Sequence, residues 1–166
     1  MDEGLIEVKV KGIVVDPKAN NPVVVLVDLE GQRALPIWIG VFEAEAISRG
    51  LEEAVTLRPM THDLMRQILD TFKASVKRVV ISDLKGNTFY ASLYIVIDGE
   101  ELIIDSRPSD AIALAVRVKA PIYIAPAVVE STQQLGLLGS NLLDEQDDLK
   151  SIISNMKPED FGKYRM

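Results

Sequence analysis

The sequence contains no cysteine and only one histidine, so several kinds of site are excluded before any motif is considered. Without cysteine there is no disulfide framework, no thiolate zinc site and no cysteine nucleophile. With one histidine there is no histidine pair for zinc. The absence of cysteine also fits a reducing compartment, and we expect a cytoplasmic protein.

Long apolar runs are missing as well. The longest, such as 23–27, have the length of a strand and fall far short of the roughly 20 residues that span a bilayer. The opening Met1-Asp2-Glu3-Gly4 carries acids where a secretory signal would carry positive charges. We therefore expect no export signal and no membrane role.

The sequence also has fewer positive than negative charges. Lys and Arg total 18 against 25 acids, which gives a formal net charge of −7. Proteins that hold nucleic acid nonspecifically usually present a basic field to the phosphates. Any role with nucleic acid must therefore depend on local arginines or on bound metal ions.

The apolar pattern predicts two groups of three strands. Residues 5–15 alternate with period two, and the β-branched residues 23–28 and the segment 33–39 follow after turn signals, which predicts a first β-meander. Residues 77–84, 88–97 and 101–105 predict a second meander, joined by Lys85-Gly86-Asn87 and Asp98-Gly99-Glu100. A short strand is expected at 121–124.

Helices are predicted where the period changes. The first begins near Glu43, although Gly50 weakens it, and its apolar stripe is Ala44, Ile47, Leu51, Ala54 and Val55. The second has Thr61 as its expected N-cap, and its buried stripe is Leu64, Met65, Ile68, Leu69 and Phe72. The third runs from Ala111 to about Lys119 and is apolar on more than one side. Weaker patterns suggest a helical turn at 133–138 and an exposed amphipathic helix at 142–156.

This order predicts a single α+β domain rather than a doubly wound parallel sheet. In it, two β-meanders form a mixed or antiparallel sheet packed by three main helices. We expect residues 1–130 to make up this domain and residues 131–166 to form a C-terminal helical extension packed on or beside it.

A local echo marks the candidate site: Arg58-Pro59-Met60-Thr61-His62-Asp63 and Arg107-Pro108-Ser109-Asp110 both place Arg-Pro before a helix. An arginine at such a corner, beside free helix amides, suits phosphate capture. Equally, the arginine could tie down its own loop by bonding to Asp105, Asp110 or a carbonyl. Arg117 lies two turns after Asp110 on the same helix face, where it could bind phosphate or make a structural ion pair.

The one imidazole and the acids also have two interpretations each. His62 could be a general acid-base or a metal ligand, but a lone histidine in a first helical turn is more often structural. Asp63 and Asp110 each suit the positive end of a helix, and with Glu43 or Glu45 they could instead hold a divalent cation such as Mg²⁺. Those two glutamates project about 200° apart on one helix, so at most one is a good candidate.

Three segments together resemble the bifunctional nuclease domain family. They are Leu35-Pro36-Ile37-Trp38-Ile39-Gly40 with Glu43-Ala44, then Arg58-Pro59-Met60-Thr61-His62-Asp63-Leu64, and Asp105-Ser106-Arg107-Pro108-Ser109-Asp110-Ala111-Ile112-Ala113-Leu114-Ala115. The resemblance covers about residues 5–130 and implies DNA or RNA as partner. Its polar signature falls on Glu43, Arg58, His62, Asp63, Arg107, Ser109, Asp110 and Arg117. Trp38 could be a platform on which bases stack, but a position in the hydrophobic core is favoured.

Two hypotheses follow. The first is a metal-assisted nuclease, with His62, Asp63 and Asp110 catalytic and phosphate bound by Arg58, Arg107, Ser109 and Arg117; the candidate cation ligands are Glu43, Asp63 and Asp110. The alternative is a non-catalytic homo-oligomeric binding or regulatory module, because every polar residue can also be explained as a cap or an ion pair. A homo-oligomer, most simply a dimer, is expected in either case.

Overall fold

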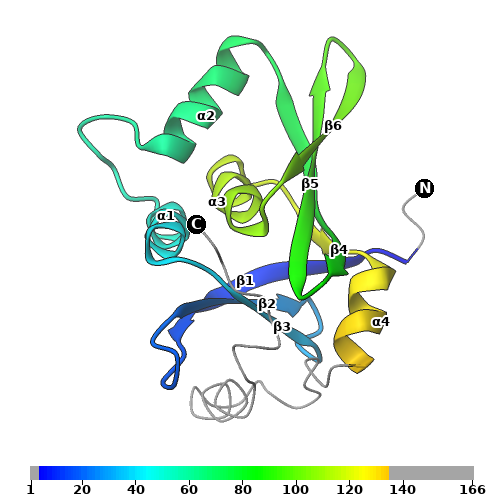
Figure 1. Cartoon of the computed structure of the whole chain (residues 1–166). Helices are drawn as coiled ribbons and strands as arrows, with labels where there is room; N and C mark the ends of the chain where they lie inside the picture. Colours follow the sequence, from blue (N-terminus) through cyan, green and yellow to red (C-terminus); the bar gives the residue numbers. More distant parts are fainter. Residues whose placement is uncertain (1–3, 135–166) are drawn as a thin grey trace.

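The computed structural model describes residues 4–134, in which seven strands and four helices form one α+β domain (Figure 1). The expected fold class is confirmed. The helix expected at 142–156 and most of the C-terminal extension lie outside the described residues, so the division at residue 130 stays a prediction. Within residues 4–134, no helix is long and apolar enough to cross a bilayer.

The strands join into one sheet in the order β3-β2-β1-β7-β4-β5-β6. Strands β1 (Ile6–Val15), β2 (Pro22–Asp28) and β3 (Ala34–Trp38) form one antiparallel meander. Strands β4 (Ser75–Lys85), β5 (Thr88–Ile97) and β6 (Glu100–Ser106) form the other. Strand β7 (Ile122–Ile124) connects the two, because it pairs antiparallel with β1 and parallel with β4.

Burial explains the strand patterns. Every residue of β2 is buried, which accounts for its continuous apolar sequence, whereas β5 alternates between buried and more exposed positions. Trp38 is a core residue, as favoured, since it is 6% exposed and its indole nitrogen donates a hydrogen bond to Asp16 at 3.2 Å. The described part of the core thus spans both meanders.

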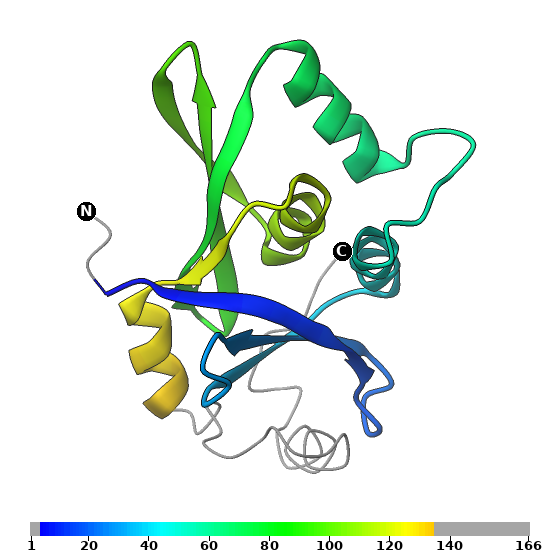
Figure 2. The ribbon, with the colours of Figure 1, turned by 180° about the vertical axis from the view of Figure 1, so that it is seen from behind.

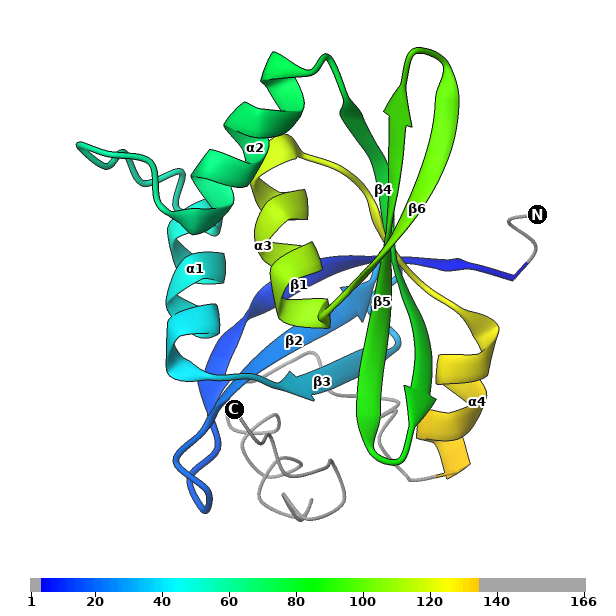
Figure 3. The same ribbon diagram turned by 45° about the horizontal axis from the view of Figure 1, so that its top comes forward.

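Helix α3 (Pro108–Val118) is the central helix. Its position between other elements explains why its sequence is apolar on more than one side. Its residues 111–115 are all buried. Helices α1 (Val41–Leu51) and α2 (Thr61–Thr71) pack against α3 on one side of the molecule (Figure 3). Helix α4 (Pro126–Gln134) lies at the opposite end, as the rear view shows (Figure 2). The sequence predicted only a turn near its end.

Two expected apolar stripes are partly wrong. On α2, Met65 and Leu69 pack against the core, but Leu64, Ile68 and Phe72 are 48–66% exposed. The reason is that α2 lies on the outside of α3, so only a narrow part of its apolar face is covered. Helix α1 ends at Leu51, which leaves Val55 in the following loop with 98% of its surface exposed.

The helix starts also differ from expectation. Met60, and not Thr61, is the N-cap of α2, and its backbone N–H donates to Asp63 Oδ2 at 3.0 Å. Helix α3 starts at Pro108 with Arg107 as N-cap, three residues before the expected Ala111. Proline suits the first helical turn, because the amide that it lacks would have no partner there. Both Arg-Pro corners therefore lead into helices, as expected.

Candidate functional site

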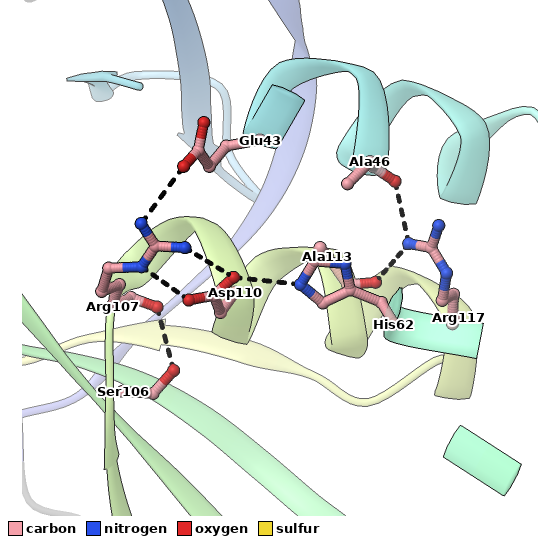
Figure 4. Close-up of polar contacts among 8 residues, drawn as sticks. All are labelled: Glu43, Ala46, His62, Ser106, Arg107, Asp110, Ala113 and Arg117. Atoms are coloured by element: carbon pink, nitrogen blue, oxygen red, sulfur yellow. Dashed lines mark hydrogen bonds and ion pairs between the residues drawn. The ribbon is translucent and has the colours of Figure 1, made fainter. Parts of the chain in front are cut away.

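Helices α2 and α3 bring His62 and Asp110 together. His62 Nε2 lies 3.0 Å from Asp110 Oδ1, although the two residues are 48 apart in the sequence (Figure 4). The imidazole is buried, and it is the one residue of α2 that is. Each residue lies in the first turn of its helix, so the contact joins the two helix starts that the Arg-Pro echo had marked.

Arg107 holds the same carboxylate from its other side. Its Nε donates to Asp110 Oδ2 at 2.7 Å, and Nη2 donates to Oδ1 at 3.1 Å. Nη1 donates to Glu43 Oε1 at 3.1 Å, which ties the start of α3 to the start of α1 (Figure 4). The loop-tying interpretation of Arg107 is thus confirmed for Asp110, and Glu43 is an additional partner. These bonds raise the pKa of the Arg107 guanidinium.

The charge on Asp110 is fixed by these neighbours. The hydrogen bond with His62, followed by those from Arg107, lowers the pKa of Asp110 to about 2, against the opposing effect of burial. An ionised carboxylate only accepts hydrogen bonds, so the shared proton must be on Nε2 of His62. In the neutral ring Nδ1 then carries the free lone pair, which is the form that a general base requires.

Arg117 forms a second buried arrangement beside the first. Its Nε donates to Asp63 Oδ1 at 2.7 Å, and its Nη1 donates to the carbonyls of Ala46 at 2.8 Å and Ala113 at 2.7 Å. The side chain is 5% exposed, and its carboxylate partner is Asp63 on α2 and not Asp110. Burial raises the pKa of Asp63, but the bonds from Arg117 and the Met60 amide outweigh it, so the net shift is downward.

Two cavities border these groups. The smaller, of about 310 Å³, is lined by Glu43, His62, Arg107, Asp110 and Arg117 among others. The larger, of about 570 Å³, includes Asp63 and again Arg117 in its lining. Four of the expected catalytic and phosphate-binding residues therefore share one cavity, namely His62, Arg107, Asp110 and Arg117, while Asp63 lines the neighbouring cavity.

The remaining expected residues lie elsewhere. Arg58 lines neither cavity. Ser109 is 1% exposed, and its hydroxyl has no hydrogen-bond partner among the described residues. It lines neither cavity, so its expected contact with phosphate stays a prediction.

The donor set does not form a ready cation site. Within residues 4–134, no group of three or more histidine, aspartate and glutamate side chains is arranged to hold a metal ion. Glu43, Asp63 and Asp110 each bond to an arginine, so their oxygens already face positive charge. Mg²⁺ at these three residues stays a prediction.

Gly50 is a residue whose importance the sequence did not reveal. A Cβ at this position would lie 2.5 Å from Val116 Cγ2 and 2.8 Å from Arg117 Nη1. Because position 50 has no side chain, helices α1 and α3 can approach closely. This close approach lets Arg117 reach the Ala46 carbonyl. A glycine inside a predicted helix was the available signal, since it often marks a close packing contact.

The fold and the site together define an α+β domain with a hydrogen-bonded His-Asp-Arg cluster at a cavity. Comparison with known proteins identifies the family of the chain. The bifunctional nuclease domain matches residues 24–135, more than half of the chain, and the chain belongs to that family.

Two kinds of relative are found. An uncharacterised protein of Mycobacterium tuberculosis strain H37Rv is 39% identical over 165 residues, which covers 93% of this chain and 97% of that protein. Bifunctional nuclease 2 of Oryza sativa subsp. japonica is 29% identical over 110 residues, covering 64% of this chain and 34% of the rice protein. Bifunctional nuclease 1 of the same subspecies is 24% identical over 112 residues, covering 66% and 34%.

Proposed function

We propose that this protein is a nuclease that hydrolyses phosphodiester bonds in DNA or RNA, and that it acts in the cytoplasm. The observation that carries the proposal is the 3.0 Å contact between His62 Nε2 and an ionised Asp110 at the wall of a cavity. Membership in the bifunctional nuclease domain family and the names of the rice relatives support it.

In the proposed reaction His62 is the general base. Its Nδ1 takes a proton from water while the water oxygen bonds to phosphorus, and the ester bond from phosphorus to the leaving oxygen breaks. The leaving alkoxide takes a proton, which the imidazolium can return. Asp110 holds the ring and stabilises its charged form, because the carboxylate stays ionised far below neutral pH. General base catalysis of this kind contributes about 10²–10⁴-fold.

Phosphate binding is assigned to the unused donors of Arg107 and Arg117. A guanidinium has five N–H groups, and the bonds described above use three in each residue. Within the part of the chain that the structure describes, the remaining N–H groups are on Nη1 and Nη2 of Arg107 and on Nη2 of Arg117. The Arg107 side chain is 53% exposed, so a phosphate can reach it. Planar arginine donors match phosphate oxygens in pairs.

The test is turnover of end-labelled single-stranded DNA and RNA by the purified protein, with Mg²⁺ and, separately, with EDTA. The variants are His62→Ala and Asp110→Asn, and Asp83→Asn is the matched control because its partner Lys85 lies in the distant β4-β5 hairpin. We expect both site variants to lose at least about 100-fold in kcat, and the control to keep its rate.

Chemical rescue sharpens the test. Imidazole added to the buffer can occupy the space left by His62→Ala and restore part of the rate if the ring is the base. Cleavage that survives unchanged in both site variants, while circular dichroism shows them folded, would overturn the proposal. The comparison with EDTA tests the expected cation at Glu43, Asp63 and Asp110.

A second candidate function, assembly into a homodimer, is supported by exposed apolar side chains on two elements. On α2 these are Leu64, Ile68 and Phe72, and on β6 they are Leu102, Ile103 and Ile104, with exposed fractions of 46–66%. In the described sheet β6 is also an edge strand, so one side of its backbone is open to pairing. Exposed apolar side chains and an open strand edge are typical of interfaces.

A further inference from the structure

The larger cavity lies next to the proposed catalytic cavity, and helices α1, α2 and α3 line both. The end of α1, the loop 52–60, α2 and the C-terminal turn of α3 supply its walls. Its volume of about 570 Å³ exceeds the 310 Å³ of the catalytic cavity, and Arg49 and Arg117 line both. A cavity of several hundred Å³ has the size of a small-molecule or nucleotide site.

Positive charge is concentrated in this cavity. Its lining includes Arg49, Arg66, Arg117 and Lys119 but only two acids, Glu53 and Asp63, while the chain as a whole carries −7. The ion pair between Lys119 and Glu53 is 3.0 Å long, but both side chains are more than 70% exposed. Exposed pairs of this kind contribute little and exchange readily with a ligand.

Arg66 is the distinctive residue of the lining. Within residues 4–134 its side chain has no hydrogen bond or ion pair, although its charge is near enough to Asp63 to lower the pKa of that carboxyl. It is exposed and lies one turn along α2 from His62. A guanidinium without a partner on a cavity wall is available to an anionic ligand.

Arg117 provides a buried donor between the two cavities. Among the described residues 4–134, its Nε and Nη1 bond to Asp63 and two carbonyls, and Nη2 makes no hydrogen bond. Figure 4 shows the two bonds from Nη1 of Arg117 to the carbonyls of Ala46 and Ala113. Because the side chain is 5% exposed and fixed on three sides, this donor is preorganised and not a flexible surface group.

We propose that the larger cavity binds a second phosphate of the same single strand, on the nucleotide next to the one whose phosphodiester is in the catalytic cavity. This inference rests on the proposed nuclease function for the identity of its ligand. Arg66 and Arg117 contact the phosphate, and the apolar wall formed by Val55, Leu57 and Pro59 contacts its base. The strand therefore crosses Arg117, and the second site sets the position of the cleaved bond.

The test is binding of a fluorescein-labelled oligothymidylate 12-mer, followed by anisotropy in EDTA. The variant is Arg66→Glu, and the control Arg33→Glu makes the same charge change at an exposed position in the β2-β3 turn, away from both cavities. We expect the Kd of Arg66→Glu to rise at least tenfold and that of the control less than twofold. The plot of the logarithm of the association constant against the logarithm of the salt concentration should also become less steep, by about 0.7, because one phosphate contact is lost.

Two further measurements identify the ligand. Inorganic phosphate and thymidine monophosphate compete with the 12-mer, and both should compete far more weakly than an unlabelled 12-mer, because each occupies one cavity only. In cleavage assays Arg66→Glu should raise KM and leave kcat nearly unchanged, since Arg66 touches no reacting atom in this proposal.

The outcomes separate this inference from the proposed function. If the protein cleaves no nucleic acid but Arg66→Glu still weakens binding of the 12-mer selectively, the nuclease proposal fails and the phosphate site stands. If cleavage occurs but Arg66→Glu and Arg33→Glu have the same Kd and KM, the second site is wrong and the nuclease proposal is unaffected. Equal competition by free phosphate and the 12-mer overturns the single-strand assignment.

Discussion

Arg117 Nε and Asp63 Oδ1 lie 2.7 Å apart and join the last turn of α3 to the first turn of α2, across 54 residues of sequence. The same guanidinium bonds to Ala46 in α1 and to Ala113 in its own helix. One side chain thus fixes three helices relative to one another. The positions of His62 and Asp110 depend on that arrangement, because they are carried by two of those helices.

Replacing Arg117 by methionine should therefore destabilise the fold. The variant leaves the Asp63 carboxylate and two carbonyls without this donor, and leaving a partly buried polar group without its partner costs about 1–3 kcal/mol. Urea unfolding followed by circular dichroism measures the change. Arg49→Met is the matched control, because the Arg49–Glu45 pair is exposed and should contribute less than about 1 kcal/mol. Equal losses in the two variants would contradict this role of Arg117.

Gly50→Ala should destabilise the protein although alanine favours helices. The new Cβ would be 2.5 Å from Val116 Cγ2 and 2.8 Å from Arg117 Nη1, so either these packed side chains or the two helices must shift. Overpacking of this kind costs about 1–3 kcal/mol, more than the roughly 1 kcal/mol that alanine gains in helix propensity. Ser48→Ala on the same helix gains propensity without this contact and serves as control. A Gly50→Ala protein with a raised Tm would show that the helices are not in close contact here.

Stability should fall in acid partly through Asp110. Its pKa in the folded protein is about 2, below its ordinary value of 3.8, so its contribution to stability is fully present above about pH 4 and is lost as the pH falls through 2. After allowance for partial exposure, this contribution is about 1–2 kcal/mol. Asp110→Asn should remove that part of the pH dependence, as measured by urea unfolding at pH 7, 4 and 2.5. Asp98→Asn, in an exposed turn, is the charge-matched control and should keep the wild-type profile. Identical profiles for the two variants would remove Asp110 as a source of acid sensitivity.

The strands could be predicted closely because a half-buried strand leaves a direct mark in the sequence. The period-two pattern and the Gly-containing turns located β5 at 88–97, and the structure gives Thr88–Ile97. The apolar period of α2 also identified a helix, but it could not tell which apolar residues would meet another element. Leu64, Ile68 and Phe72 are exposed for that reason.

The site was only partly predictable because its contacts join distant segments. The two Arg-Pro corners were visible in the sequence, and they do bring His62, Arg107 and Asp110 to one cavity. The sequence did not show which carboxylate Arg117 would bind. Arg117 bonds to Asp63 and not to Asp110, because the packing of α2 on α3 decides which carboxylate it reaches. Arg66 had no sequence signal, because a single arginine on a helix surface is ordinary until a cavity is known to lie beside it.

Self-association should depend on the exposed apolar side chains of β6 and α2. We expect the wild type to be a dimer in sedimentation velocity, and Ile103→Lys or Ile68→Lys to be monomeric, because a lysine on either surface leaves a charge to be buried in the interface. Val15→Lys, at a 54% exposed position at the end of β1, is the control and should stay dimeric. A monomeric wild type, or dimers in all three variants, would place the interface elsewhere or remove it.

Turnover by the monomeric variants then relates the two proposed functions. His62, Arg107 and Asp110 bond to one another within a single chain, so the proposed catalytic cluster is complete without a partner. We therefore expect Ile103→Lys, which changes a β6 side chain outside the lining of both cavities, to keep the wild-type kcat on single-stranded DNA as a monomer. If the folded monomer has lost turnover, the second chain supplies part of the site. The reason is that dissociation would be the only change affecting the catalytic cluster in this variant.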